Sequence, residues 1–352
     1  MTLQFKCPNC GGDMQFDAAS GYLKCPHCDH SEKIEGAEMS AEIHVSPDFP
    51  HQDQVDETGA LVRYQCQNCG AMLVTERNTT ATTCSYCGSP VVLSDRLEGT
   101  TKPDYVIPFK IPKENADQAF RDWCKKLRYS PSDFKNMVKV KKVEGLYAPF
   151  WVYNVSGQGE ARAHATISHS HTEGDYEVTE TAHYDIYRSV DTFYRGVPAD
   201  ASERLADNLM DLMEPFDYTQ MVPFNAPYLT GYMAENYDYN DTQVFPRVQK
   251  RVYNYMDDFV RDSIHGYDTV TITDRDYIAN RSQSSYCLFP IWMNYVTYKG
   301  KDYSFAQNGE TGKIVGKPPI YLGAVAGYIA GWTFGIFILL RIICVLMGGP
   351  LL

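Results

Sequence analysis

The sequence predicts an α+β protein with two small metal-binding modules at the N-terminus, a mixed α+β body and one transmembrane helix at the C-terminus. Three observations lead to this prediction. One cysteine pattern is written twice near the N-terminus, a long middle section alternates aromatic strand-like segments with amphipathic ones, and a charge-free apolar run follows. With 352 residues and 44% hydrophobic content, the chain is long enough for two or three domains with a sizeable core.

Eight cysteines form two sets with the same spacing. Each set reads C-x2-C-x14-C-x2-C, and every position of the first set recurs 59 residues later. Two such knuckles bring four thiolates around one tetrahedral zinc ion, with zinc–sulfur distances of about 2.3 Å. Two zinc ribbons are therefore predicted, at residues 1–32 and 61–97. Their predicted ligands are Cys7, Cys10, Cys25, Cys28, Cys66, Cys69, Cys84 and Cys87.

The two predicted zinc ions have a structural role. Four thiolates fill the coordination sphere, whereas a catalytic zinc keeps one position open for water or substrate. A disulfide framework is the competing interpretation. Residues 1–4 do not begin a signal peptide, and paired C-x2-C knuckles are typical of metal sites in a reducing compartment. The two zinc ions are the cofactors that the sequence predicts.

The charge of the chain disfavours nucleic acid as a partner. The formal net charge is -12, and residues 1–100 contain six Lys or Arg against fourteen Asp or Glu. Proteins that bind nucleic acid gain much of their affinity by neutralising phosphates with Lys and Arg. We therefore expect the ribbons to contact proteins.

Residues 33–60 are predicted to be a linker, and residues 100–316 the α+β body. The linker is acidic and contains Pro47 and Pro50, which oppose a helix. In the body, residues 113–127 predict a helix because Ala116, Phe120 and Cys124 share one face. Alternation and β-branched or aromatic residues predict strands at 105–109, 269–273, 286–298 and 302–307. They also predict a long β region that begins at 147–153 and runs through 161–169 and 176–192. Further helices are predicted after a cap at Ser202 and at 226–236 and 242–264, with a hairpin turn at 308–312.

Two short segments of the body echo each other. Residues 149–152 read Pro-Phe-Trp-Val and residues 290–293 read Pro-Ile-Trp-Met, and each follows a predicted helical stretch. This echo suggests that the body consists of two related lobes.

The C-terminal segment predicts a single transmembrane helix over residues 318–347. Residues 318–340 carry no charge, and about 20 apolar residues cross the hydrocarbon core of a bilayer. The lysines that precede the segment place the N-terminal bulk in the cytoplasm. Four glycines recur every fourth residue on one stripe of this helix, which favours packing against another helix. They are Gly323, Gly327, Gly331 and Gly335.

No catalytic residue is predicted. The sequence has no P-loop, no G-x-S-x-G and no H-E-x-x-H motif. His164, His169 and His171 lie on a predicted strand, where the last two share a face and suit a metal, but solvent-facing histidines are the favoured interpretation. The acids Glu214, Asp217, Asp257 and Asp258 are interpreted as solvated side chains at helix ends.

With its paired ribbons and several short segments, the chain resembles the bacterial TFIIB-type zinc-ribbon membrane proteins. The resemblance runs from Cys7 to the apolar run. The segments that carry it are residues 107–111, 147–151, 198–202, 214–218 and 305–313. Members are often labelled primosomal replication-restart helicases, although this sequence has no motor motif. The resemblance implies partners among SPFH-domain proteins and phage-shock-type membrane coat proteins.

Two main functional hypotheses follow, beside a third of an enzyme in the aromatic β body, which requires a pocket with a convergent acid, base or histidine pair. The first is a non-enzymatic, membrane-anchored adaptor that recruits cytoplasmic proteins to the inner membrane surface in envelope stress. The second is a membrane-linked protein that binds DNA or RNA in replication restart or transcription without a helicase motor of its own.

Overall fold

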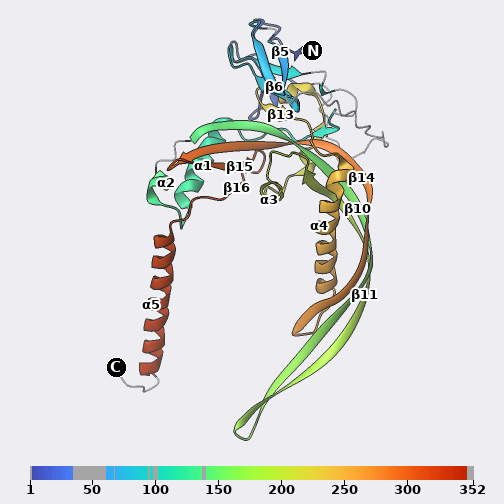
Figure 1. Ribbon diagram of the computed structural model, residues 1–352, viewed down its shortest axis with the longest axis vertical. Helices are drawn as coiled ribbons and strands as arrows, with labels where there is room; N and C mark the ends of the chain where they lie inside the picture. The colour runs from blue at the N-terminus through green and yellow to red at the C-terminus, as the bar shows by residue number, and fades with distance from the viewer. Residues whose placement is uncertain are drawn as a thin grey trace.

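The computed structural model describes residues 2–34, 61–66, 68–93, 96–97, 102–136 and 140–346. Most of the predicted linker lies outside the described residues. The described part of the chain is a mixed α+β structure, as the sequence predicts (Figure 1).

A large sheet of eleven strands organises the body. Three of its strands are very long and antiparallel, and they bend together into a curved arm that extends away from the rest of the body (Figure 1). These are β10 (Val140–Glu173), β11 (Tyr176–Asp200) and β14 (Thr269–Tyr298). Shorter strands complete the body part of the sheet: β9 (Tyr105–Val106), β12 (Val222–Pro223), β13 (Met233–Glu235), β15 (Lys301–Asn308) and β16 (Ile314–Gly316).

Helix α4 (Asp241–Asp262) covers the concave face of the arm (Figure 1). It begins with a capping box, in which Asn240 and Gln243 exchange side-chain and backbone hydrogen bonds. Its buried residues recur every fourth position as one apolar stripe, which packs on small side chains of β10. The stripe consists of Val244, Val248, Val252, Met256 and Val260.

The core lies at the body ends of the three long strands, and aromatic side chains dominate it. The two echoing segments lie on the neighbouring strands β10 and β14 of the same sheet. The indole of Trp151 donates to the carbonyl of Tyr239 at 2.9 Å, and the indole of Trp292 donates to the carbonyl of Ile111 at 3.0 Å. The division of the body into two related lobes stays a prediction.

The predicted helix at 113–127 is present as α1 (Lys113–Lys126), with Ala116, Phe120 and Cys124 buried. Helices α2 (Ser132–Asn136) and α3 (Asp207–Asp211) are short. The prediction of a helix at 226–236 is wrong. A 3-10 turn, η4 (Ala226–Leu229), is followed by β13, because this backbone pairs with β7 and β10 instead of with itself. A second 3-10 turn, η3, spans Tyr218–Gln220.

The first cysteine module comprises residues 2–34. It has its own sheet of three short strands, β2 (Gln15–Asp17), β3 (Tyr22–Lys24) and β4 (Ser31–Glu32). Its first strand, β1 (Thr2–Leu3), pairs instead with β8 of the other module.

The second cysteine module comprises the described residues between 61 and 97. One hairpin, β5 (Leu61–Gln65) and β6 (Met72–Glu76), stands apart from the large sheet. The other, β7 (Thr79–Thr83) and β8 (Pro90–Leu93), belongs to the large sheet through the pairing of β7 with β13.

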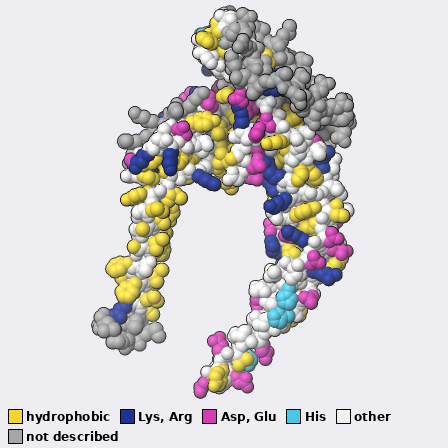
Figure 2. Space-filling view, in the orientation of Figure 1, with side chains coloured by type: hydrophobic (Ala, Val, Ile, Leu, Met, Phe, Trp, Pro, Cys, Tyr) yellow, Lys and Arg dark blue, Asp and Glu magenta, His cyan; other side chains and the backbone are white. Residues whose placement is uncertain are grey.

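Helix α5 (Leu322–Leu346) leaves the body at the end away from the cysteine modules (Figure 1). It begins four residues later than predicted, after Pro318 and Pro319. Its first turns contact the α1–α2 region, where Arg128 lies over the ring of Tyr328 at 4.7 Å and the amide of Tyr321 donates to the carbonyl of Tyr129. Hydrophobic side chains cover α5, whereas the arm carries mixed charged and polar ones (Figure 2).

Candidate metal centres

The first group of cysteines is built from two knuckles in the first module. The amide of Gly11 donates to the carbonyl of Cys7, and the amide of Asp29 donates to the carbonyl of Cys25. Gly11 and Asp29 both have positive φ, at 73° and 57°, which closes each turn tightly. The sulfurs of Cys7 and Cys28 lie 3.6 Å apart, and those of Cys10 and Cys25 lie 3.5 Å apart.

The second group repeats this construction. The amides of Gly70 and Gly88 donate to the carbonyls of Cys66 and Cys84, and both glycines have positive φ. The sulfurs of Cys66 and Cys87 lie 3.8 Å apart, and so do those of Cys69 and Cys84.

These separations fit a tetrahedral metal ion. An ion bound to four sulfurs at about 2.3 Å holds them about 3.8 Å apart, whereas a disulfide bond is about 2.05 Å long. Each group has four donor atoms that all lie within 4.8 Å of one another. Each site is therefore suited to a structural metal ion, with no ligand position left for chemistry.

The last cysteine of each group is prepared as a thiolate. A hydrogen bond from the backbone of His30 is the main cause that lowers the pKa of Cys28 to about 6. The side chain and then the backbone of Ser89 lower the pKa of Cys87 to about 6. Since the thiolate is the metal ligand, these hydrogen bonds favour the binding form of Cys28 and Cys87. In the same groups, backbone hydrogen bonds of Gly12 and Ala71 lower the pKa of Cys10 and Cys69, but hydrogen bonds with the other cysteines outweigh them and raise it to about 12.

The chain has a relative of nearly equal length. The "Uncharacterized protein YdjG" of Bacillus subtilis (strain 168) is 41% identical over 349 residues, which cover 99% of both chains. The chain belongs to the YdjG family. No family model matches the sequence, and no solved structure matches it. The resemblance to the TFIIB-type zinc-ribbon membrane proteins therefore stays a prediction.

Within the described part of this YdjG-family chain, α5 is the one helix long and apolar enough to cross a membrane. No residue of its 19-residue window, Val325–Ile343, is buried in the structure. The glycine stripe is open, since a Cβ added at Gly327, Gly331 or Gly335 would meet no atom within 4 Å. By length and composition, α5 is a candidate membrane anchor.

The histidines of the arm lie on its surface (Figure 2). The register of β10 and β11 places His164 beside His183, with ring nitrogens 3.0 Å apart, and beside Asp185 at 3.2 Å. His169 and His171 lie further along the arm and are exposed. Among the described residues, the two cysteine groups are the sets that bring three or more metal-binding atoms together. The contact of His183 with His164 depends on the pairing of β10 with β11 along a long hairpin. The sequence alone does not predict this pairing.

The interpretation of the acids as solvated is wrong for two of them. Asp257 is buried and paired with Arg275, and Glu214 is paired with Arg251 at 2.6 Å. The reason is that the basic partners lie on α4 and β14, elements that fold over the acids from elsewhere in the sequence.

Three of the segments that carry the family resemblance meet in one network. The side-chain amide of Asn308 donates to the carbonyls of Met213 and Pro215. Glu310, with its side chain 2% exposed, accepts from the amide of Asp217 and pairs with Lys110 at 2.9 Å. These polar groups satisfy one another, so the segments fix the position of the 213–218 loop.

Proposed function

We propose that this chain is a non-enzymatic, membrane-anchored adaptor, with a structural zinc ion in each cysteine group. In this proposal α5 anchors the chain in a bacterial cell membrane, with the bulk of the chain in the cytoplasm. The cysteine modules, folded as zinc ribbons, and the body recruit cytoplasmic proteins to that membrane.

The supporting observation is where the cysteine modules and α5 lie on the body. The cysteine modules and α5 lie at opposite ends of the body (Figure 1). An anchored α5 would therefore hold the modules away from the bilayer, where a soluble protein reaches them. The closed cysteine groups also support a structural role, since a metal ion held by four thiolates has no position for a reactant.

Insertion of α5 requires a turn relative to the arm. Both extend from the body in the same direction (Figure 1), and the arm carries exposed charges such as Glu177 and Glu180. Charged side chains do not enter hydrocarbon without a large cost in free energy. We place this turn in the segment 317–321, which has no regular structure and contains two prolines. The contacts of Tyr321 with Tyr129 and of Tyr328 with Arg128 would open in the turn.

The test is affinity purification of the full-length chain from nuclease-treated membranes, beside a Cys66→Ser/Cys69→Ser variant of equal abundance. We expect a defined set of cytoplasmic proteins with the wild type, lost with the variant. Each protein identified in this way must then bind the full-length chain in lipid nanodiscs as a purified component. Unchanged capture by the variant would remove the second module from the mechanism. Enrichment of polymerase or replisome subunits would favour the hypothesis of a nucleic-acid-binding protein.

A further inference from the structure

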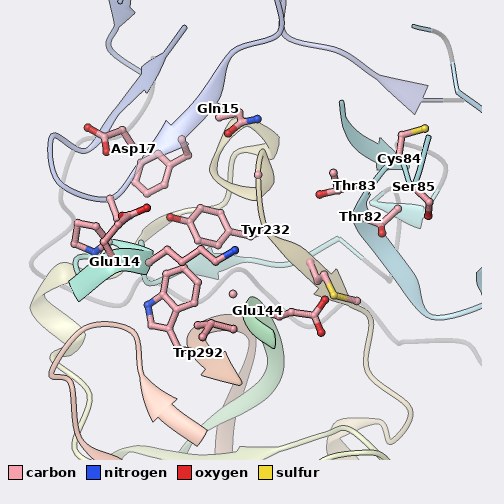
Figure 3. A pocket seen from close by; sticks show the side chains of 18 residues that line it. Gln15, Asp17, Thr82, Thr83, Cys84, Ser85, Glu114, Glu144, Tyr232 and Trp292 are labelled. Carbon is pink, nitrogen blue, oxygen red and sulfur yellow. The ribbon is translucent and has the colours of Figure 1, made fainter. Parts of the chain in front are cut away.

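A cleft of about 670 Å³ lies where both cysteine modules meet the body (Figure 3). One wall is strand β2 of the first module, and the opposite wall is residues 82–85 of the second module. The floor comes from β10, β14 and the turn before β13, and the first residues of α1 close one side. The cleft exists only where these distant segments come together.

The floor of the cleft is rigid. The ring of Tyr232 stacks on Phe109, with centroids 4.2 Å apart, and lies 5.9 Å from the ring of Trp292. A Cβ on Gly145 would come within 2.4 Å of Tyr232, so glycine allows this close packing. A ligand would therefore meet a floor that is already formed, at little cost in conformational entropy.

The lining of the cleft is acidic. Carboxylates come from three elements, Asp17 on β2, Glu114 on α1 and Glu144 on β10, against a single ammonium group on Lys113. A hydrogen bond from the side chain of Ser20 is the main cause that lowers the pKa of Asp17, so this group is charged at neutral pH.

The field of these carboxylates reaches the floor. Burial raises the pKa of Tyr232, and the negative charges of Asp17 and Glu114 raise it further from two sides. Cys84 also lines the cleft, and four thiolates around a divalent ion leave a net negative charge on the second group.

Hydroxyl groups line the wall opposite Asp17 (Figure 3). They belong to Thr82, Thr83 and Ser85 of the second module. A hydroxyl donates to a carbonyl oxygen and accepts from an amide. A peptide offers both groups along its backbone, whereas a free polyamine offers donors alone.

We propose that this cleft docks a basic segment of a partner protein, with Lys or Arg side chains held among Asp17, Glu114 and Glu144. The aliphatic stems of these side chains pack on the floor while their charged ends reach the carboxylates. The proposal rests on the proposed adaptor function and specifies the chemistry of the partner.

The test uses the full-length, zinc-loaded chain in micelles of a neutral detergent at 0.15 M salt. The probe is a fluorescein-labelled 12-residue peptide of alternating Lys and Ser, and fluorescence anisotropy reports its binding. Peptides with Glu or Gln in place of Lys serve as comparisons. We expect the Lys peptide to bind and the Glu peptide not to bind. Equal binding of all three peptides would overturn the proposal.

Two charge-matched variants locate the site. Glu114→Lys/Glu144→Lys changes the cleft, and Glu173→Lys/Glu177→Lys makes the same change in charge at exposed positions near the tip of the arm. We expect the cleft variant to raise the Kd of the Lys peptide about tenfold or more. The arm variant should raise it about twofold or less, since salt screens distant charges. Equal weakening by both variants would overturn the proposal. Metal content and near-UV circular dichroism establish that both variants are folded.

Competition with spermidine distinguishes a basic protein segment from a free polyamine as the ligand of the cleft. If spermidine displaces the Lys peptide at an equal concentration of amines, the cleft takes small polyamines and the peptide proposal fails. The two proposals also fail separately. If the wild type captures partners but does not bind the Lys peptide, the cleft proposal alone is refuted. If it binds the peptide but captures no partner from membranes, the adaptor proposal is refuted.

Discussion

The two cysteine modules share one spacing and one knuckle geometry, but they are attached to the body in different ways. The first module keeps its own three-stranded sheet. Its contact with the body centres on Phe16, whose amide donates to the hydroxyl of Thr230 at 2.9 Å and whose ring packs edge-on against Tyr228 at 5.2 Å. This direct attachment to the body is largely an apolar contact, and the pairing of β1 with β8 adds an indirect link through the second module.

The second module is part of the body sheet. Strand β7 pairs with β13, and the amide of Asn236 donates to the carbonyl of Asn78 at 2.7 Å. Arg204 bridges the two sides, since it pairs with Glu76 of the module and with Glu235 of β13. This attachment consists of backbone pairing and charged groups.

The difference shows what a repeated motif determines and what it does not. The repeated cysteines set the local turns and the sulfur positions, which are nearly the same in both modules. The residues between and after the cysteines decide whether a hairpin stands alone or extends a larger sheet. Loss of the metal ion should therefore affect only the first module when its own site is lost, and should reach the body sheet when the site of the second module is lost.

The largest expected effect is the loss of one metal ion. Cys7→Ser/Cys10→Ser and Cys66→Ser/Cys69→Ser should each reduce the metal content from two ions to one and unfold the affected module, because structural zinc supplies about 10 kcal/mol or more of folding free energy in small domains. Hydrogen exchange should then differ between the variants. We expect the first variant to lose protection within residues 2–34, and the second to lose it in β7, β8 and β13.

Elemental analysis and exchange measured by mass spectrometry check this prediction on the full-length chain. Loss of protection in β13 in both variants, to the same extent, would mean that the two attachments do not differ.

A smaller effect is expected from removing the apolar contact of the first module. Phe16 is 4% exposed, so Phe16→Ala should destabilise this module and its contact with the body by about 3 to 5 kcal/mol. We expect faster hydrogen exchange in residues 226–233 while β7 and β8 stay protected. Tyr22→Ala is the matched control, because Tyr22 lies on the next strand and is 42% exposed. If both substitutions have the same effect, Phe16 does not hold the module in place.

The sequence predicted well what depends on local spacing. The eight cysteines and the apolar face of α1 follow from residues close together in the chain, and both are in place. The prediction of a helix at 226–236 was wrong because strand β13 forms only against β7 and β10. The sequence predicted a long β region through 147–192, but it predicted β14 as two separate strands, since its continuity depends on cross-strand pairing over register shifts such as Asn154/Val155.

The cleft could not be predicted for the same reason. Its walls and floor come from residues 15–18, 82–85, 112–114, 143–145 and 231–233, together with Trp292. No spacing in the sequence connects these segments. They meet because both modules are docked on the same part of the body.

The smallest expected effect is a difference in pH dependence between the two attachments. Burial raises the pKa of Glu235 beside the second module, although Arg204 opposes this shift, whereas the side chain of Ser20 lowers the pKa of Asp17 in the first. A raised carboxyl pKa contributes stability below its ordinary value of about 4.3, and the contribution is lost as pH rises through the raised value. A lowered pKa contributes stability above the ordinary value of about 3.9, and the contribution is lost as pH falls.

Glu235→Gln and Asp17→Asn should therefore change the pH dependence of protection in opposite senses, each by about 1 kcal/mol or less. Hydrogen exchange in β13 and in β2, compared between each variant and the wild type at every pH, measures the effect and cancels any common loss of metal in acid. If both variants shift in the same sense, the carboxyl groups of Asp17 and Glu235 have the same electrostatic character, and this contrast between the two modules fails.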